Sequence, residues 1–235
     1  MLLDVKDITV HYYKVPAVRN ISISVEKGKI AALIGSNGAG KTTILRSISG
    51  LIHPTTGEIR FRGQNIAKLP AHKINAMGIA MVPEGRRVFP QMTVMENLLT
   101  GAHLRKDRTE IQRDLEDVVF KHFPRLKERK NQSAGTLSGG EQQMLAIARG
   151  YMSGPQTLLV DEPTLGLAPI MVETVKEILK TINNEKKVPI LIMEENLDAI
   201  ADIADRIFLL RYGKLKLMDS YEETKKNIQL HIDNS

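Results

Sequence analysis

The sequence contains no cysteine, few aromatic residues and no long apolar run, and each absence excludes a class of protein. Without cysteine the chain can form neither disulfides nor thiolate-rich metal sites, which fits a reducing compartment. No apolar stretch reaches the roughly eighteen residues that a membrane span needs. The opening "MLLDVKDITV" brings in Asp4 and Asp7 where a signal peptide would be basic and then apolar. We therefore expect a soluble chain.

The composition is that of a globular protein. The 235 residues, 42% hydrophobic and 26% charged, can bury a substantial core as one domain with or without a subdomain. The net charge is +6, but basic and acidic residues alternate in runs such as "RLKERK" (125–130), and no aromatic residues are interleaved with the basic ones. These runs indicate a solvated face, and we expect no nucleic-acid partner.

Hydrophobic periodicity predicts an α/β fold. Runs with the pattern of strands lie at 2–13, 21–26, 27–35, 55–63, 79–83, 157–161, 188–193 and 206–211. Patterns typical of helices lie at 70–78, 137–152, 169–184 and 196–205, and at 111–123, where Ile111, Leu115, Val118, Val119 and Phe123 form one apolar stripe. Alternating helices and strands predict right-handed crossovers and a parallel sheet covered on both faces. The polar tail, 220–235, is expected to fray.

The stretch "GSNGAGKTT" (35–43) lies between a predicted strand and a predicted helix and matches the pattern G-x-x-x-x-G-K-[ST] in full. The glycines let backbone N–H groups converge on a phosphate, Lys41 reaches the β- and γ-phosphates, and Thr42 can ligate Mg²⁺. A chance match in a glycine-rich loop is the alternative, and the strand–loop–helix context argues against it. The predicted nucleotide-binding residues are Gly35, Ser36, Asn37, Gly38, Ala39, Gly40, Lys41, Thr42 and Thr43.

A second motif, "TLLVDEP" (157–163), is an apolar strand that ends in two acids. Many strands end in an acid, so the motif has meaning only beside the phosphate-binding loop. In that setting Asp161 is placed to hold Mg²⁺ and Glu162 to orient and polarise the attacking water.

A third motif, "LSGGEQQMLAIARGYM" (137–152), begins with an S-x-x-E capping box made by Ser138 and Glu141. The two glycines leave the N-terminal amides of the helix open to an anion. An ordinary helix cap accounts for Ser138 and Glu141 but for neither Gly139 nor Gly140.

The three motifs occur in the order found in the ATP-binding cassette (ABC) ATPases, and the resemblance covers nearly the whole chain. It implies an α/β P-loop NTPase fold with a RecA-like parallel-sheet core, an antiparallel β subdomain and a helical subdomain at about 86–153, all within one domain, 1–235. In such proteins two cassettes pair head to tail. Ser138, Gly139, Gly140 and Glu141 would therefore contact ATP held by the partner cassette.

The segments "MVPEGRRVFPQMTVMENL" (81–98) and "DEPTLGLAP" (161–169) resemble the shorter cassette of branched-chain amino-acid importers. This resemblance implies ATP hydrolysis coupled to import, with ATP and Mg²⁺ bound. The implied partners are a second cassette, transmembrane permease subunits and, indirectly, a periplasmic or extracellular solute-binding protein, with the chain on the cytoplasmic face of the membrane. The alternatives are a cassette for another solute (another amino acid, urea or an amide), a soluble ABC ATPase, and a weakly hydrolysing regulator.

The family resemblance assigns further residues around the nucleotide. Tyr12 stands where the family stacks an aromatic ring on adenine, with Val18 nearby, while Tyr13 is expected to point elsewhere. A tyrosine that merely covers the core at a strand end is the alternative for Tyr12. Glu84 replaces the glutamine that usually reaches Mg²⁺, and its carboxylate is an oxygen ligand of the right kind. A surface ion-pairing acid is the alternative for Glu84.

Two further segments resemble regions of the family that contact other chains. "RRVF" (86–89) falls where a short helix of the membrane subunit docks, so that Phe89 is either an interface residue or buried in its own subdomain. Ala168 replaces an aspartate that many members use to communicate across the dimer.

Glu195, in "MEEN" (193–196), stands where the family usually has a histidine, or in the amino-acid importers often a glutamine, that hydrogen-bonds the γ-phosphate. An ionised glutamate cannot donate that hydrogen bond and repels the phosphate. Three outcomes remain open: Glu195 turns away, it takes a proton when ATP binds, or hydrolysis at this composite site is slow and the partner's site carries turnover.

Overall fold

Two β-sheets and several helices make up the part of the chain that the computed structural model describes, residues 1–218 and 221–232, with side chains described up to 228. The larger sheet has the strand order β10 (Lys214–Met218), β9 (Arg206–Arg211), β3 (Ile30–Ile34), β8 (Ile190–Glu194), β7 (Thr157–Asp161) and β6 (Ile79–Val82). The smaller sheet has the order β2 (Val15–Val25), β1 (Leu3–Tyr12), β4 (Thr56–Phe61) and β5 (Gln64–Asn65). The pairs from β9 to β6 are parallel, whereas β10 pairs with β9 antiparallel and the smaller sheet is antiparallel throughout.

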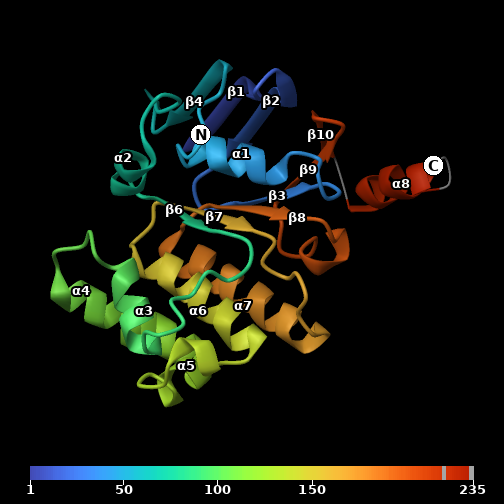
Figure 1. Ribbon diagram of the computed structural model, residues 1–235. Helices are drawn as coiled ribbons and strands as arrows, with labels where there is room; N and C mark the ends of the chain where they lie inside the picture. Colours follow the sequence, from blue (N-terminus) through green and yellow to red (C-terminus); the bar gives the residue numbers. More distant parts are fainter. Residues whose placement is uncertain (219–220, 233–235) are drawn as a thin grey trace.

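The helices fall into groups on the two sides of the larger sheet (Figure 1). On the side of the smaller sheet lie α1 (Lys41–Ile48) and α2 (Ala71–Ala76). On the other side lie α3 (Val94–Gly101), α4 (Arg108–Arg113), the π-helix η1 (Asp114–Phe120), α5 (Pro124–Glu128), the 3₁₀ turn η2 (Ala134–Thr136), α6 (Gly139–Met152) and α7 (Pro169–Lys186). The 3₁₀ turn η3 (Leu197–Ala199) follows β8, and α8 (Tyr221–Ile232) ends the described chain.

The strands of the larger sheet are apolar on both faces because each face carries its own core. In β3, Ile30, Ala32 and Ile34 pack into the core shared with α6 and α7. The alternate residues Ala31 and Leu33 pack into the core shared with α1 and the smaller sheet. A sheet covered on both sides is built from continuous apolar runs, which is the pattern that predicted it. The predicted fold class is therefore confirmed.

The segment 196–205 is not the helix that its periodicity predicts. It forms only the 3₁₀ turn η3, and the remainder is turns. Its buried residues Leu197, Ile200 and Ile203 are spaced by three, which suits a 3₁₀ turn as well as an α-helix. The side chain of Asn196 caps this turn by accepting a hydrogen bond from Asp198 N at 3.0 Å.

The C-terminal tail also differs from expectation, since 221–232 form the helix α8 instead of fraying. The hydroxyl of Tyr221 donates a hydrogen bond to Asp198, which ties the helix to the segment after β8. The expectation for 220 and 233–235 lies outside the described residues. No helix within the described ranges is both long and apolar enough to cross a membrane. The division into a single domain with a helical subdomain at 86–153 stays a prediction.

Candidate active site

Three neighbouring strands of the larger sheet end at the same edge. In β3 and β8, Ile34 pairs with Glu194, and in β7 and β8, Asp161 pairs with Met193. Because these strands are parallel, the segments that follow them emerge together. Gly35 N donates to Glu194 O at 3.2 Å, and Glu162 N donates to Met193 O at 2.9 Å. The sheet thus brings the loop 35–43, the acids of the second motif and the two glutamates after β8 to one place.

The loop 35–43 leads directly into helix α1, whose N-cap is Gly40. Gly40 has φ of 111°, a left-handed conformation that favours glycine, and a Cβ there would collide with the Cγ1 of Val18. Val18 itself is fully buried, so it supports the loop from behind. The absence of a side-chain cap on α1 leaves the first amides of the helix directed at an anion.

Lys41 and Glu162 form a buried ion pair in this site. Lys41 Nζ lies 2.9 Å from Glu162 Oε1, and each side chain is only 5% exposed. Lys41 Nζ also donates to Gly35 O at 2.6 Å and to Ser36 O at 3.2 Å. The lysine predicted to bind phosphate and the glutamate predicted to act on water are therefore in contact.

Asp161 has the features of a magnesium ligand. It is 1% exposed, and neither of its carboxylate oxygens accepts a hydrogen bond from the described residues. Burial raises the pKa of Asp161 to about 6, the neighbouring Thr42 hydroxyl opposes the rise, and Glu162 and Glu84 add to it. A buried carboxylate without a donor fits a cation, since Mg²⁺ uses one or two protein oxygens together with phosphates and water.

The described residues contain no group of three or more acidic, histidine or cysteine side chains that could hold a metal by themselves. Glu84 is exposed. It forms no ion pair with a described residue, so the structure does not show the surface ion pair that was the alternative for this residue.

The two glutamates after β8 have different surroundings. Glu194 is 2% exposed and accepts hydrogen bonds from Thr164 Oγ1 at 2.7 Å and from Glu195 N at 3.0 Å. Burial raises the pKa of Glu194 to about 7, helped by the neighbouring Glu162 carboxylate and opposed by Thr164. Glu195, by contrast, is exposed, and its carboxylate accepts hydrogen bonds from Asn37 N at 3.3 Å and Asn37 Nδ2 at 2.8 Å.

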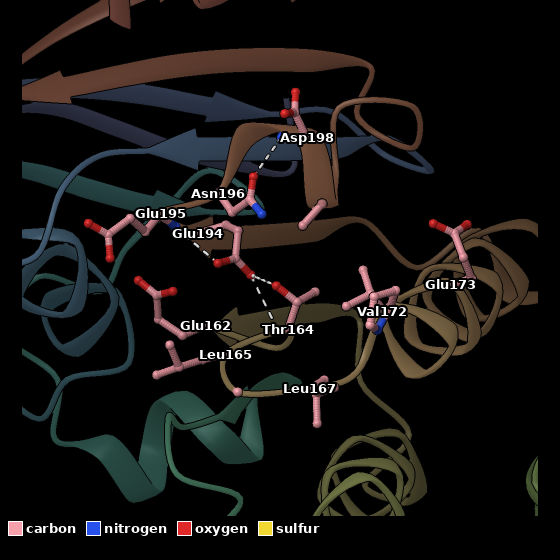
Figure 2. A pocket seen from close by; sticks show the side chains of 13 residues that line it. Glu162, Thr164, Leu165, Leu167, Val172, Glu173, Glu194, Glu195, Asn196 and Asp198 are labelled. Carbon is pink, nitrogen blue, oxygen red and sulfur yellow. Dashed lines mark hydrogen bonds between the residues drawn. The ribbon is translucent and has the colours of Figure 1, made fainter. Parts of the chain in front are cut away.

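A cavity of about 460 Å³ opens beside these acids. Figure 2 shows Glu162, Glu194 and Glu195 at one end of the cavity and Glu173 at the other. Thr164 contributes to its wall from the segment after Glu162. Nothing in the sequence singled out Thr164 or the pairing of Asn37 with Glu195, because both depend on contacts between distant segments.

The two tyrosines at the end of β1 point in different directions, as the sequence predicts. Tyr13 is fully exposed, whereas Tyr12 is 42% exposed and its hydroxyl accepts a hydrogen bond from Thr43 Oγ1 at 3.5 Å. Tyr12 therefore lies at the Thr43 end of the phosphate-binding loop. Its contact with adenine stays a prediction.

The third motif forms the start of α6 with the capping box that the sequence predicts. Ser138 N donates to Glu141 Oε2 at 2.9 Å and Glu141 N donates to Ser138 Oγ at 3.4 Å. The carboxylate of Glu141 also lies 3.4 Å from Arg129 Nε. Arg86 packs directly against Gly139, where a side chain would displace its guanidinium. The contact of this motif with a nucleotide stays a prediction.

A second cavity, also about 460 Å³, lies between β6, α3 and α6 and is lined in part by Phe89 and Arg149. Phe89 is 49% exposed, so it is not buried in its own subdomain. The guanidinium of Arg149 lies 5.1 Å from the centre of the Phe89 ring, and its Nη2 donates to Arg87 O at 2.6 Å. The buried Asn97 exchanges hydrogen bonds with the backbone of Phe89. These contacts hold Phe89 at the wall of the groove.

Comparison with known proteins agrees with this geometry. The family model described as "ABC transporter" matches residues 18–165. The chain is 44% identical over 220 residues to the high-affinity branched-chain amino acid transport ATP-binding protein BraG of Pseudomonas aeruginosa, covering 93% of each chain. It is 35% identical over 215 residues to the probable branched-chain amino acid transport ATP-binding protein LivF of Archaeoglobus fulgidus, covering 92% of this chain and 90% of that one.

Among solved structures, the chain is similar to MJ1267, an ATP-binding cassette of an ABC transporter, in its ADP conformation. The TM-score is 0.84 at 26% sequence identity, and the match covers 98% of both chains. The similarity thus extends over both sheets and the helices.

Proposed function

The chain belongs to the ABC transporter family, and on that premise we propose that it is the ATP-hydrolysing subunit of an importer of branched-chain amino acids. The observation that carries the proposal is the meeting of the phosphate-binding loop, Asp161 and Glu162 at one edge of the larger sheet, with Lys41 in contact with Glu162. The transported solute is inferred from the 44% identity with BraG over nearly the whole chain.

The proposed reaction is the in-line attack of water on the γ-phosphate of ATP. The amides of the loop and Lys41 hold the phosphates, and Glu162 orients and polarises the water. Mg²⁺ bound through Thr42 and Asp161, with Glu84 nearby, would neutralise charge on the β- and γ-phosphates. Tyr12, at the Thr43 end of the loop, would stack on the adenine base.

A second cassette completes the site in this proposal. Ser138 caps helix α6, which begins with Gly139 and Gly140, and the amides of the two glycines are available to the γ-phosphate bound by the partner. Glu141 supports them by capping the helix. Binding of ATP would close the two cassettes on each other, and hydrolysis would let them reopen.

The groove lined by Phe89 and Arg149 is the proposed contact with the permease subunits. An exposed aromatic ring held beside an arginine is typical of the centre of a protein interface. Through this contact the chain would lie on the cytoplasmic face of the membrane. A solute-binding protein would act on the opposite face and touch this chain only indirectly.

The test is to express the chain with candidate permease subunits, purify the complex from membranes and reconstitute it in liposomes. Uptake of leucine, isoleucine and valine should depend on ATP, and uptake of urea and of acidic or basic amino acids should not. Glu162→Gln should lower both ATP turnover and uptake by at least about 100-fold, because it removes the group that polarises water, without preventing assembly. Purification of the chain with ribosomes or DNA instead of permease subunits would refute the transport function.

The docking groove can be tested in the same complex. Phe89→Ala should reduce recovery of the permease subunits, while Leu51→Ala, which also shortens an exposed apolar side chain but lies outside the groove, should not. Equal recovery with both variants would mean that Phe89 does not contribute to the interface.

A further inference from the structure

The carboxylate of Glu195 occupies hydrogen-bond donors of the phosphate-binding loop. Its Oε1 accepts from the backbone N–H of Asn37 at 3.3 Å, and its Oε2 accepts from Asn37 Nδ2 at 2.8 Å. Backbone N–H groups of such a loop are the donors that bind phosphate oxygens. A carboxylate offers two anionic acceptor oxygens, so Glu195 takes the place of a phosphate at this point of the loop.

On the proposed function, Asn37 lies at the end of the loop that the terminal phosphate would reach. Tyr12, the residue expected to contact the base, touches Thr43 at the opposite end. Lys41 lies between these ends and contacts Glu162, the residue expected to act on the attacking water. With Tyr12 at the base and Glu162 at the attacking water, as proposed, the order from Thr43 through Lys41 to Asn37 would run from the base to the last phosphate.

The position of Glu195 is fixed by the buried carboxylate before it. Glu194 accepts the N–H of Glu195 at 3.0 Å and the hydroxyl of Thr164 at 2.7 Å, which anchors the backbone next to Glu195 to the segment that follows Glu162. The start of the loop is tied to the end of the same strand, since Gly35 N donates a hydrogen bond to Glu194 O at 3.2 Å. Glu195 is therefore held beside Asn37 by the surrounding structure.

From this geometry we propose that Glu195 sets the selectivity of the site between nucleoside triphosphate and diphosphate by competing with the terminal phosphate for Asn37. The inference rests on the proposed function, because it requires that ATP binds in this loop. A diphosphate ends before Asn37 and leaves the contact with Glu195 intact. A triphosphate must displace an anion and then lie beside it, so its affinity is lowered relative to that of the diphosphate.

The experiment compares the affinities of two nucleotides for the full-length chain with Mg²⁺, by calorimetry. The probes are ADP and AMP-PNP, a non-hydrolysable triphosphate. In Glu195→Gln, the side chain keeps an acceptor for Asn37 but loses its charge and gains donors for a phosphate. This variant should bind AMP-PNP about tenfold more tightly and ADP within about twofold of the wild type.

Two further variants sharpen the comparison. Glu195→Ala should also raise the affinity for AMP-PNP relative to ADP, because it removes the competing anion. Glu173→Gln is the matched control, since Glu173 lines the same cavity at its far end and its Oε1 pairs with Lys176 Nζ at 2.9 Å (Figure 2). The control should leave the ratio of the two affinities unchanged.

The outcomes separate this inference from the proposed function. If the wild-type chain binds both nucleotides and Glu195→Gln changes both affinities equally, or if Glu173→Gln changes the ratio as much, the inference is overturned while the ATPase stands. If the wild-type chain binds neither nucleotide, the proposed function and the inference fail together. An increase in affinity for AMP-PNP but not for ADP, seen only in the Glu195 variants, supports the inference.

Discussion

Lys41 Nζ lies 2.9 Å from the carboxylate of Glu162, and both side chains are 5% exposed. The residue proposed to bind phosphate and the residue proposed to act on water thus neutralise each other within one buried pair. A phosphate that draws Lys41 to itself would release the carboxylate of Glu162 toward water. With the proposed roles of the two residues, binding of the nucleotide would free the Glu162 carboxylate to act on water.

This pairing predicts non-additive effects on stability. Lys41→Met should lower the free energy of unfolding by about 3 kcal/mol, because it leaves the buried Glu162 without its cation, and it should abolish nucleotide binding. The double variant Lys41→Met with Glu162→Gln should lose at least about 1 kcal/mol less than the sum of the single variants. Urea unfolding of the four proteins measures both quantities. Strict additivity would show that the two side chains do not stabilise each other.

Glu194 should make the stability of the chain depend on pH. Its pKa is raised from 4.5 to about 7 in the folded chain, so between these values the folded state holds a proton that the unfolded state has lost. The free energy of unfolding should therefore fall as pH rises through this window, by at most about 3 kcal/mol. Asp161, with its pKa raised to about 6, adds to the fall in the same direction.

The measurement is urea unfolding at pH 5 and pH 8. Glu194→Gln should reduce the difference between the two pH values, because its side chain does not ionise, while Glu173→Gln should leave the difference as it is in the wild type. An equally large difference in Glu194→Gln would assign the pH dependence to other groups.

Two glycines of the phosphate-binding loop should respond differently to the same substitution. Both have positive φ, 111° for Gly40 and 78° for Gly38. A Cβ at Gly40 would collide with Val18, whereas a Cβ at Gly38 meets no atom within 4 Å. Gly38→Ala should cost about 1 kcal/mol for its backbone conformation alone, and Gly40→Ala about 2 to 4 kcal/mol with loss of nucleotide binding. Equal costs by thermal unfolding would contradict the steric role of Val18.

Asp161 and Glu84 should differ in their effect on the requirement for Mg²⁺. Asp161→Asn removes the charge from a buried carboxylate without a hydrogen-bond donor, so the Mg²⁺ concentration for half-maximal AMP-PNP binding should rise about tenfold. Glu84→Gln should raise it less, because Glu84 is exposed to solvent. An unchanged requirement in Asp161→Asn would remove Asp161 from the metal site.

Turnover should increase when Glu195 is replaced by a residue that can donate a hydrogen bond to the terminal phosphate. We expect weak ATPase activity from the wild-type chain alone and higher activity from Glu195→Gln and Glu195→His, since both replace a repelling carboxylate with a group that can donate a hydrogen bond to the charge that develops on the terminal phosphate in the transition state. Steady-state release of phosphate at saturating ATP is the measurement. Unchanged or lower turnover in both variants, with nucleotide affinity intact, would show that Glu195 does not limit hydrolysis.

The sequence predicted the elements whose signals are local. The loop 35–43, the capping box of Ser138 and Glu141, and the apolar strands that end at Asp161 and Glu194 all lie where their patterns predict. The prediction of a helix at 196–205 was wrong because the three-residue spacing of Leu197, Ile200 and Ile203 is shared by α-helices and 3₁₀ turns. Helix α8 was missed because a polar stretch carries little periodic signal, while its tie to Asp198 comes from elsewhere in the chain.

The chemical identity of the site was determined by the sequence itself, because a phosphate-binding loop needs its glycines, lysine and threonine at fixed spacing. The relation of Asn37 to Glu195 was decided only by the tertiary structure. These residues are far apart in the chain and meet because β3 and β8 pair in parallel with Ile34 opposite Glu194. The same pairing, extended to β7, brings Glu162 beside Lys41. The spacing of residues along the chain therefore determines the motif, whereas the register of the parallel strands determines which side chains of distant motifs are in contact.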